Sequence, residues 1–167
     1  MIFAVDVDYK NEAARAAGIL FSDWSAPEPE STLITIIQNI EPYEPGFFYK
    51  RELPCILALL KKVPMPLETI IVDGYVTLGK ENKPGLGMYL HQSLETSTPI
   101  IGVAKKSFKD TPEECKLWRG QSKNPLYITS VAMSLKKAKS HIKNMHGQHR
   151  IPTLLKSVDQ LCRSQNP

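Results

Sequence analysis

Two acidic residues stand at the ends of short apolar segments that are typical of buried strands. Asp73 ends the run Ile70–Val72 and precedes Gly74, and Asp6 ends the run Ile2–Val5. A continuous run of β-branched apolar residues favours a strand buried on both faces, usually a parallel strand of an α/β sheet. Because open α/β sheets bind ligands at the carboxyl ends of their strands, both aspartates are candidate site residues. In the alternative interpretation each aspartate only begins a turn.

A divalent cation would allow these acids to lie close together. Two aspartates on adjacent strands repel each other unless a cation lies between them, and carboxylate oxygens suit Mg²⁺ or Mn²⁺. Glu52 is a third acid available for the cluster, and Lys105, at the end of another apolar run, would offset charge on a phosphate. Such a site can activate water and stabilise the leaving oxygen of a phosphodiester. Alternatively, Glu52 is only an exposed acid of a helix, and Lys105 and Lys106 are surface lysines.

The order of the predicted elements indicates how these residues are positioned. Strands are expected at residues 2–9, in the later part of 13–24, and at 32–40, 68–73 and 99–104, with a further short strand at 125–131. Helices are expected at 47–62, 86–94, 133–145 and 152–162, and Pro54 is expected to interrupt or kink the first of them. The first three strands favour an antiparallel meander. This order indicates an α/β, ribonuclease H-like fold: a mixed five-stranded sheet flanked by helices, with the first and fourth strands as neighbours.

Composition is that of an ordinary soluble globular protein. The 167 residues, 42% apolar and 23% charged, suit one domain over residues 1–167. No apolar run reaches the roughly 18 residues that a membrane span requires, and the start meets Asp6 without a basic segment, unlike a signal peptide. Cys55, Cys115 and Cys162 are odd in number and widely spaced, which indicates neither a disulfide framework nor a zinc site. A cytoplasmic protein with no membrane partner is expected.

Charge is distributed unevenly along the chain. Residues 1–99 carry 8 Lys and Arg against 13 Asp and Glu, a net charge of −5, whereas residues 100–167 carry 13 against 4, a net charge of +9. A basic C-terminal part beside an acidic N-terminal part is consistent with a surface for a polyanion near a metal-binding cluster. It is equally consistent with charges spread over a solvated surface.

Several short motifs occur together and in a characteristic order. They are Ala4-Val5-Asp6-Val7, Pro42-Tyr43-Glu44-Pro45-Gly46, Tyr49-Lys50-Arg51-Glu52, Val72-Asp73-Gly74, the segment from Pro99 to Lys105, and Arg150-Ile151-Pro152. In these motifs the chain resembles the endonuclease V family. Members are metal-dependent, deoxyinosine 3′-endonuclease-like enzymes that cut a strand near deoxyinosine or, in some members, near inosine in RNA. The resemblance covers nearly the whole chain.

The resemblance implies a role for each matching residue. Asp6, Glu52 and Asp73 would be the acidic positions of a site for Mg²⁺ or Mn²⁺, and Lys105 would be the catalytic lysine. The partner would be DNA, possibly RNA, bound by a monomer.

The resemblance also implies the nucleic-acid-binding residues. The loop 42–45 would separate the strands, with Tyr43 stacking on bases opened beside the lesion. The base pocket would lie near Gly74 and the Gly85–Gly87 segment, where a flipped base needs close approach to the backbone. Lys106 would contact the nucleic acid.

The chain departs from the family pattern at three places. Family members usually have a glycine-histidine pair before the penultimate helix, but segment 128–134 contains no histidine. A second family histidine falls on Tyr89, two residues from His91. The chain is also shorter than typical members, chiefly between Lys105 and Pro125. Three other histidines are candidate substitutes: His141, His146 and His149.

Three functional hypotheses follow from the sequence. The first is a metal-dependent endonuclease that acts near deoxyinosine, inosine or other altered bases, in nucleic-acid repair. The second is a catalytically weak or inactive relative that binds nucleic acid through its basic C-terminal part, which would give steeply salt-dependent binding without cleavage. The third is an α/β interaction module in which the set of acids is accidental.

Overall fold

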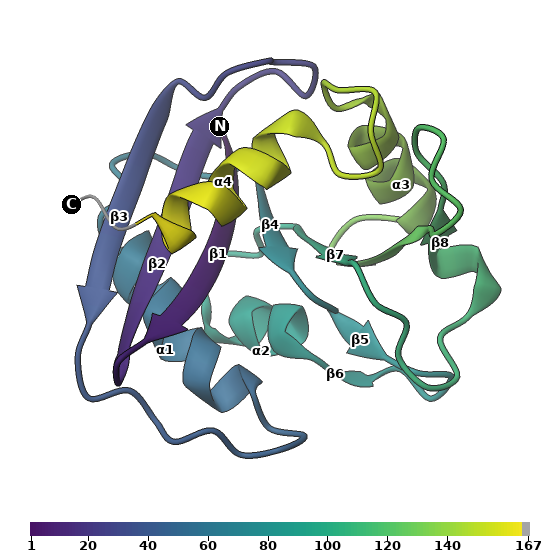
Figure 1. The fold of residues 1–167 in the computed structure, drawn as a ribbon. Coiled ribbons are helices and arrows are strands. Elements are labelled where there is room, and N and C mark those ends of the chain that lie inside the picture. Colours follow the sequence, from purple (N-terminus) through teal and green to yellow (C-terminus); the bar gives the residue numbers. More distant parts are fainter. Residues whose placement is uncertain (165–167) are drawn as a thin grey trace.

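A computed structural model describes residues 1–164, which form a mixed sheet with helices on both faces (Figure 1). Seven strands are hydrogen-bonded in the order β3-β2-β1-β4-β7-β9-β8. Their bounds are β1 Ile2–Lys10, β2 Ala13–Phe21, β3 Ser31–Ile37, β4 Thr69–Asp73, β7 Ile100–Ala104, β8 Lys116–Leu117 and β9 Leu126–Val131. The other elements are α1 Tyr49–Leu60, α2 Leu86–Ser93, the 3₁₀ helix Glu113–Cys115, α3 Leu135–Asn144, α4 Thr153–Arg163 and a small ribbon of β5 Thr77–Leu78 with β6 Lys83–Pro84.

Strand pairing confirms the predicted meander and the crossover. β1 is antiparallel to β2, and β2 is antiparallel to β3. The chain then passes through α1 and returns as β4, which pairs in parallel with β1, Val5 lying opposite Val72. β7 extends the sheet in parallel with β4. Parallel neighbours end at the same edge, so this topology brings the ends of β1, β4 and β7 together.

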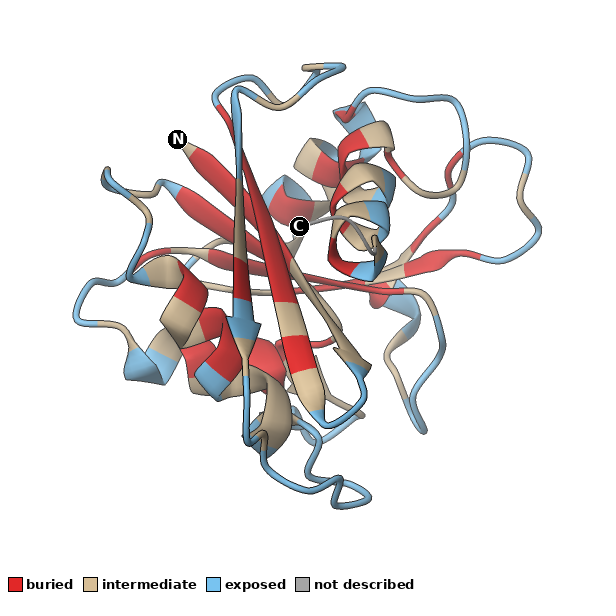
Figure 2. Cartoon of the chain, turned by 60° about the vertical axis from the view of Figure 1, so that its left-hand side comes forward, coloured by how far each residue is buried: buried red, intermediate tan, exposed pale blue. Residues whose placement is uncertain are grey.

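The central strands are buried on both faces, as their apolar runs predict. Ile2 and Ala4 pack with α3 and α4 on one face, whereas Phe3 and Val5 pack with α1 and α2 on the other. Figure 2 shows the buried residues concentrated in the central strands and in the helix surfaces that cover them. This alternation follows from the two-residue repeat of a strand.

Two details of the fold differ from the sequence-based expectation. The five strands expected in the sheet are present, and the further strand expected at 125–131 is β9. Because β9 and β8 continue the same sheet, the expected number of five is too low. Helix α1 also runs through Pro54 without interruption. Pro54 is exposed, so the hydrogen bond that its missing N–H removes is lost on the solvent side, while Cys55, Ile56 and Leu59 anchor the buried side.

Candidate active site

Three side chains predicted from strand ends meet at one edge of the sheet. Asp6 lies on β1, one residue beyond the pair Val5–Val72, and Asp73 is the last residue of β4. Lys105 follows β7, and its Nζ lies 3.2 Å from Oδ2 of Asp73. The backbone N–H of Val7 donates to Asp6 Oδ1 at 2.8 Å and orients that carboxylate. The parallel pairing of β1, β4 and β7 is therefore what assembles this part of the site.

Glu52 lies on α1 and approaches the two aspartates from the face of the sheet that α1 and α2 cover. Burial, together with the nearby carboxylates of Asp6 and Asp73, raises the pKa of Glu52 to about 8. Burial and the charge of Asp73 likewise raise the pKa of Asp6 to about 7. Like charges that lose water disfavour their ionised forms. The site therefore has an excess of negative charge.

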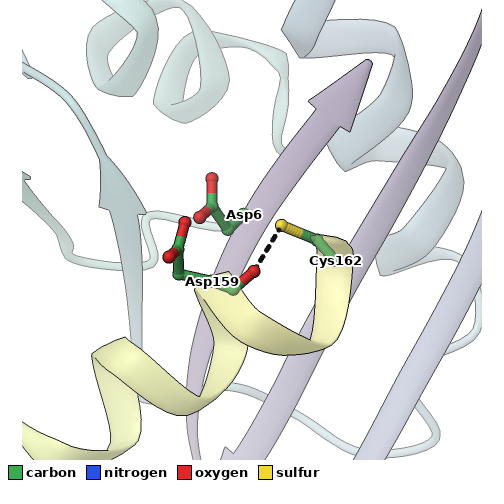
Figure 3. A group of neighbouring side chains, drawn as sticks. All are labelled: Asp6, Asp159 and Cys162. Carbon is green, nitrogen blue, oxygen red and sulfur yellow. Dashed lines mark hydrogen bonds between the residues drawn. The ribbon is translucent and has the colours of Figure 1, made fainter. Parts of the chain in front are cut away.

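Asp159 is a fourth acid at this site, and the sequence-based reasoning missed it. It lies on α4, where Figure 3 shows its carboxylate beside that of Asp6. Ligand atoms of Asp6, Asp159 and Cys162 all lie within 4.8 Å of one another, and the Cys162 thiol donates to the Asp159 carbonyl at 3.1 Å. The sequence offered one indication of Asp159. It is one of only four acids in residues 100–167, and it directly follows the apolar Val158 in an amphipathic helix.

Lys105 is the positive charge that pairs with Asp73. Burial opposes its charge, but the Asp73 carboxylate, at hydrogen-bond distance, outweighs burial and raises the pKa of the ammonium. Both side chains remain about one third exposed. A substrate oxygen at the edge of the sheet can therefore reach Lys105.

The chemistry of the donor set fits a hard divalent cation. Asp6, Glu52, Asp73 and Asp159 offer carboxylate oxygens, the ligands that Mg²⁺ and Mn²⁺ prefer. Within residues 1–164 the compact set of possible ligand atoms combines Asp6 and Asp159 with the Cys162 thiol, and the predicted partners Glu52 and Asp73 are not part of it. Burial and repulsion raise the pKa values of Asp6 and Glu52 although Lys105 lowers that of Asp6 and Arg51 lowers that of Glu52. A cation would supply the missing positive charge.

The predicted nucleic-acid-binding residues fall into two groups. Tyr43 is 64% exposed in the loop before α1, Lys106 is exposed after β7, and Gly74 (φ +139°) has open space where a Cβ would point. Gly85 and Gly87 instead pack on the chain itself. A Cβ would lie 2.6 Å from the Tyr75 carbonyl oxygen at Gly85, and 2.6 Å from Cγ2 of Val76 at Gly87. Close packing of α2 on the β4–β5 connection therefore suffices to explain these two glycines.

The candidate histidines lie at different places. His141 stacks on Trp24 with ring centroids 4.2 Å apart, and His146 Nδ1 lies 2.9 Å from Thr153 Oγ1. His149 lines a hollow that also contains Lys105 and Asp159. Of these three histidines, only His149 lines a hollow that Asp159 also lines.

The tyrosine at the second departure from the family pattern also has an aromatic partner. Tyr89 stacks on Tyr49 of α1 with ring centroids 3.9 Å apart and an interplanar angle of 13°. A stacked pair of tyrosines therefore joins α1 to α2 at this position.

Comparison with known proteins identifies the family. The family model described as Endonuclease V matches residues 1–160. The chain belongs to the endonuclease V family. The endonuclease V of Pyrococcus horikoshii is 31% identical over 167 residues, covering 98% of this chain and 74% of the relative, and that of Streptomyces coelicolor is 28% identical, covering 98% and 78%. The chain thus spans about three quarters of the length of these relatives.

Solved structures agree with this assignment at the level of the fold. The endonuclease V of Streptomyces avermitilis superposes with a TM-score of 0.75 at 26% identity, covering 97% of this chain and 79% of the other. Human ENDOV superposes with a TM-score of 0.77 at 22% identity, covering 97% and 82%. The ribonuclease H-like fold expected from the sequence is confirmed. Within residues 1–164, no helix is both long and apolar enough to cross a membrane.

Proposed function

We propose that this endonuclease V family member is a metal-dependent endonuclease that hydrolyses a phosphodiester bond near deoxyinosine or inosine. One observation carries the proposal: Asp6 lies within 4.8 Å of Asp159 and close enough to Asp73 and Glu52 for their charges to affect one another, and Lys105 pairs with Asp73 at the same edge of the sheet. A purely structural cluster of half-buried acids would destabilise the fold without an evident benefit.

The proposed mechanism assigns each residue a task. The four carboxylates would hold Mg²⁺ or Mn²⁺, which when bound lowers the pKa of water and stabilises negative charge on phosphate oxygens. Asp73 holds the Lys105 ammonium beside the site. There Lys105 would bind a nonbridging phosphate oxygen and stabilise the charge that develops as water attacks phosphorus.

Substrate choice is inferred from the family and from the loop before α1. A fold neighbour from Ciona intestinalis, 18% identical, is an endonuclease V solved with a 23mer DNA containing an inosine followed by a ribo-adenosine. In this chain the exposed Tyr43 would stack on bases opened beside such a base, and Gly74 and Lys106 would contact the nucleic acid. Gly85 and Gly87 would shape the pocket by bringing α2 close to Val76. DNA, and possibly RNA, would be bound by a cytoplasmic monomer.

Cleavage of end-labelled oligonucleotides tests the proposal. DNA and RNA with and without one inosine should be compared in Mg²⁺, in Mn²⁺ and in chelator. We expect metal-dependent nicking near inosine and none in chelator. Equal cutting with and without inosine would refute the specificity, and cutting in chelator would refute the metal chemistry.

The alternative function is binding without cleavage. It is favoured by one observation: segment 128–134 contains no histidine, and the described cluster at the acids contains carboxylates and a thiol but no imidazole. Salt-dependent binding of the same oligonucleotides with no nick in either metal would establish this alternative.

A further inference from the structure

A hollow of about 610 Å³ adjoins the acidic site between α4 and the loop before it. Lys105 and Asp159 belong to both the hollow and the site, so the two are continuous. The remaining lining comes from residues 147–160, among them His149, Arg150 and Lys156. A ligand that extends from the acids toward α4 and the loop before it must therefore enter the hollow.

The charge of the hollow suits a polyanion. Lys105, Arg150 and Lys156 line it against the single acid Asp159. Lys156 is exposed, and none of the ion pairs found within residues 1–164 includes it. Its charge is therefore available to a ligand.

A second hollow, which Tyr43 itself lines, is acidic, so that Tyr43 would meet a base there rather than a phosphate. Glu12 and Glu41 line it against the single cation Arg51. A phosphate backbone is therefore favoured in the first hollow and disfavoured in the second.

The wall of the first hollow is held in place by a buried arginine. Arg119 is 6% exposed and donates from Nη1 to the carbonyl oxygens of His149 (2.6 Å) and Arg150 (3.4 Å). It donates from Nη2 to those of Met145 (2.8 Å) and Gly147 (2.9 Å). Four carbonyls of one loop thus converge on one guanidinium, which gives the loop a fixed shape that its sequence would not maintain alone.

The same wall is tied to the catalytic lysine. Arg150 Nη2 donates to the carbonyl oxygens of Lys105 and, at 2.8 Å, of Pro125. The wall of the hollow and the backbone of Lys105 are therefore positioned together.

We propose that this hollow binds the sugar-phosphate backbone of the single-stranded segment on one side of the cut, and that Lys156 contacts a phosphate there. The inference rests on the proposed function and extends it. Lys156 precedes Asp159 by three residues, a rise of about 4.5 Å along the helix. A phosphate next to the one being cut therefore lies within reach of the lysine side chain. Arg119 is a positioning residue for this subsite.

Salt-dependent binding tests the role of Lys156. Binding of a fluorescent oligonucleotide with one inosine should be followed by anisotropy between low and moderate salt, in Mg²⁺ and in an Asp73→Asn background that leaves the strand uncut. Lys156→Ala should weaken binding severalfold and reduce the slope of log K against log salt by about 0.7–0.9, the loss of one phosphate contact. Lys156→Arg should retain the slope. Lys136→Ala, an exposed lysine of α3 outside the hollow, is the matched control and should match the parent.

Truncated oligonucleotides locate the segment. Removing nucleotides on one side of the inosine should abolish the difference between the parent and Lys156→Ala, whereas removing them on the other side should not. An unchanged slope in Lys156→Ala, or a difference that survives both truncations, would overturn the subsite while leaving the proposed function intact. A parent that neither binds nor cuts the full oligonucleotide would overturn both.

Discussion

At the scale of single residues, Asp73 and Lys105 form the contact on which the proposed chemistry depends. Their charged atoms lie 3.2 Å apart, with both side chains partly open to solvent. The exposed salt bridge itself contributes little to stability. Its importance is that it holds an ammonium group beside carboxylates that would bind a cation.

Asp73→Asn should therefore abolish cutting without unfolding the protein. The change removes one charged oxygen from the metal-binding set and the partner of Lys105, and we expect a loss of roughly 100-fold or more in rate. The measurement is nicking of the inosine oligonucleotide, with circular dichroism to confirm the fold. Glu95→Gln, at an exposed position, is the control and should cut like the parent. An Asp73→Asn variant that cuts as well as the parent would refute the assignment.

Asp159→Asn should raise the metal concentration that cutting requires. Asp159 lies beside Asp6 and also accepts a hydrogen bond from Arg163 Nε at 2.9 Å. Loss of its charge should weaken metal binding by roughly 10- to 100-fold, the range seen when groups supporting a metal site are changed. Titration of cutting with Mg²⁺ and Mn²⁺ checks this. Arg163→Gln, which removes only the hydrogen-bond donor, should shift the titration less; an equal shift would mean that Asp159 acts through Arg163.

At the scale of elements, the packing of β7 determines how closely the β4–β5 connection approaches the sheet. A Cβ on Gly102 would lie 2.6 Å from the Gly74 carbonyl oxygen and 2.7 Å from Thr129 Oγ1. That hydroxyl also accepts from the Val76 N–H at 2.8 Å. The backbone directly after Asp73 thus packs closely against Gly102, where there is no room for a Cβ.

Gly102→Ala should lower both stability and cutting. The methyl group must displace the Gly74 carbonyl or the Thr129 hydroxyl, and overpacking of this kind costs about 1–3 kcal/mol. In a chain of this length each kcal/mol lowers the unfolding midpoint by about 2–4 °C. Thermal unfolding and nicking should be measured together. An unfolding midpoint equal to that of the parent would show that the connection moves away without cost.

At the scale of the whole molecule, the buried acids link folding to pH and to metal. Folding raises the pKa of Asp6 to about 7 and that of Glu52 to about 8, whereas both lie near 4 in an unfolded chain. Between about pH 4 and pH 8 the folded chain therefore binds more protons than the unfolded chain. Its free energy of unfolding falls as pH rises through this window and becomes level above it.

The metal-free protein should accordingly lose stability between pH 5 and pH 8 as these two groups titrate. Mg²⁺ or Mn²⁺ should restore stability at pH 8, because the cation binds the folded chain. Thermal unfolding in chelator and in metal provides the measurement. The Asp6→Asn, Glu52→Gln double variant should lose most of the pH dependence and all of the metal effect. A parent that gains stability from pH 5 to pH 8 in chelator would contradict this linkage.

The sequence by itself determined the central strands and the candidate residues that stand at their ends. Apolar runs such as Ile70–Val72 have a physical reason to be buried on both faces, and the edge of a parallel sheet collects the residues that follow them. Asp6, Asp73 and Lys105 were accessible to this argument, as was the stiff loop that exposes Tyr43. Glu52 was accessible as an acid of the following helix, and its motif also matches the family.

Only the tertiary structure decided the remainder of the site. Asp159 lies on a helix whose periodicity indicates which side is buried but not which strand it meets. Arg119 lies in a stretch without periodicity, and its four acceptors are in a loop more than 25 residues further along the chain. The extension of the sheet by β9 and β8 likewise depends on long-range pairing. Such contacts depend on how layers pack over one another, which local patterns of side chains do not encode.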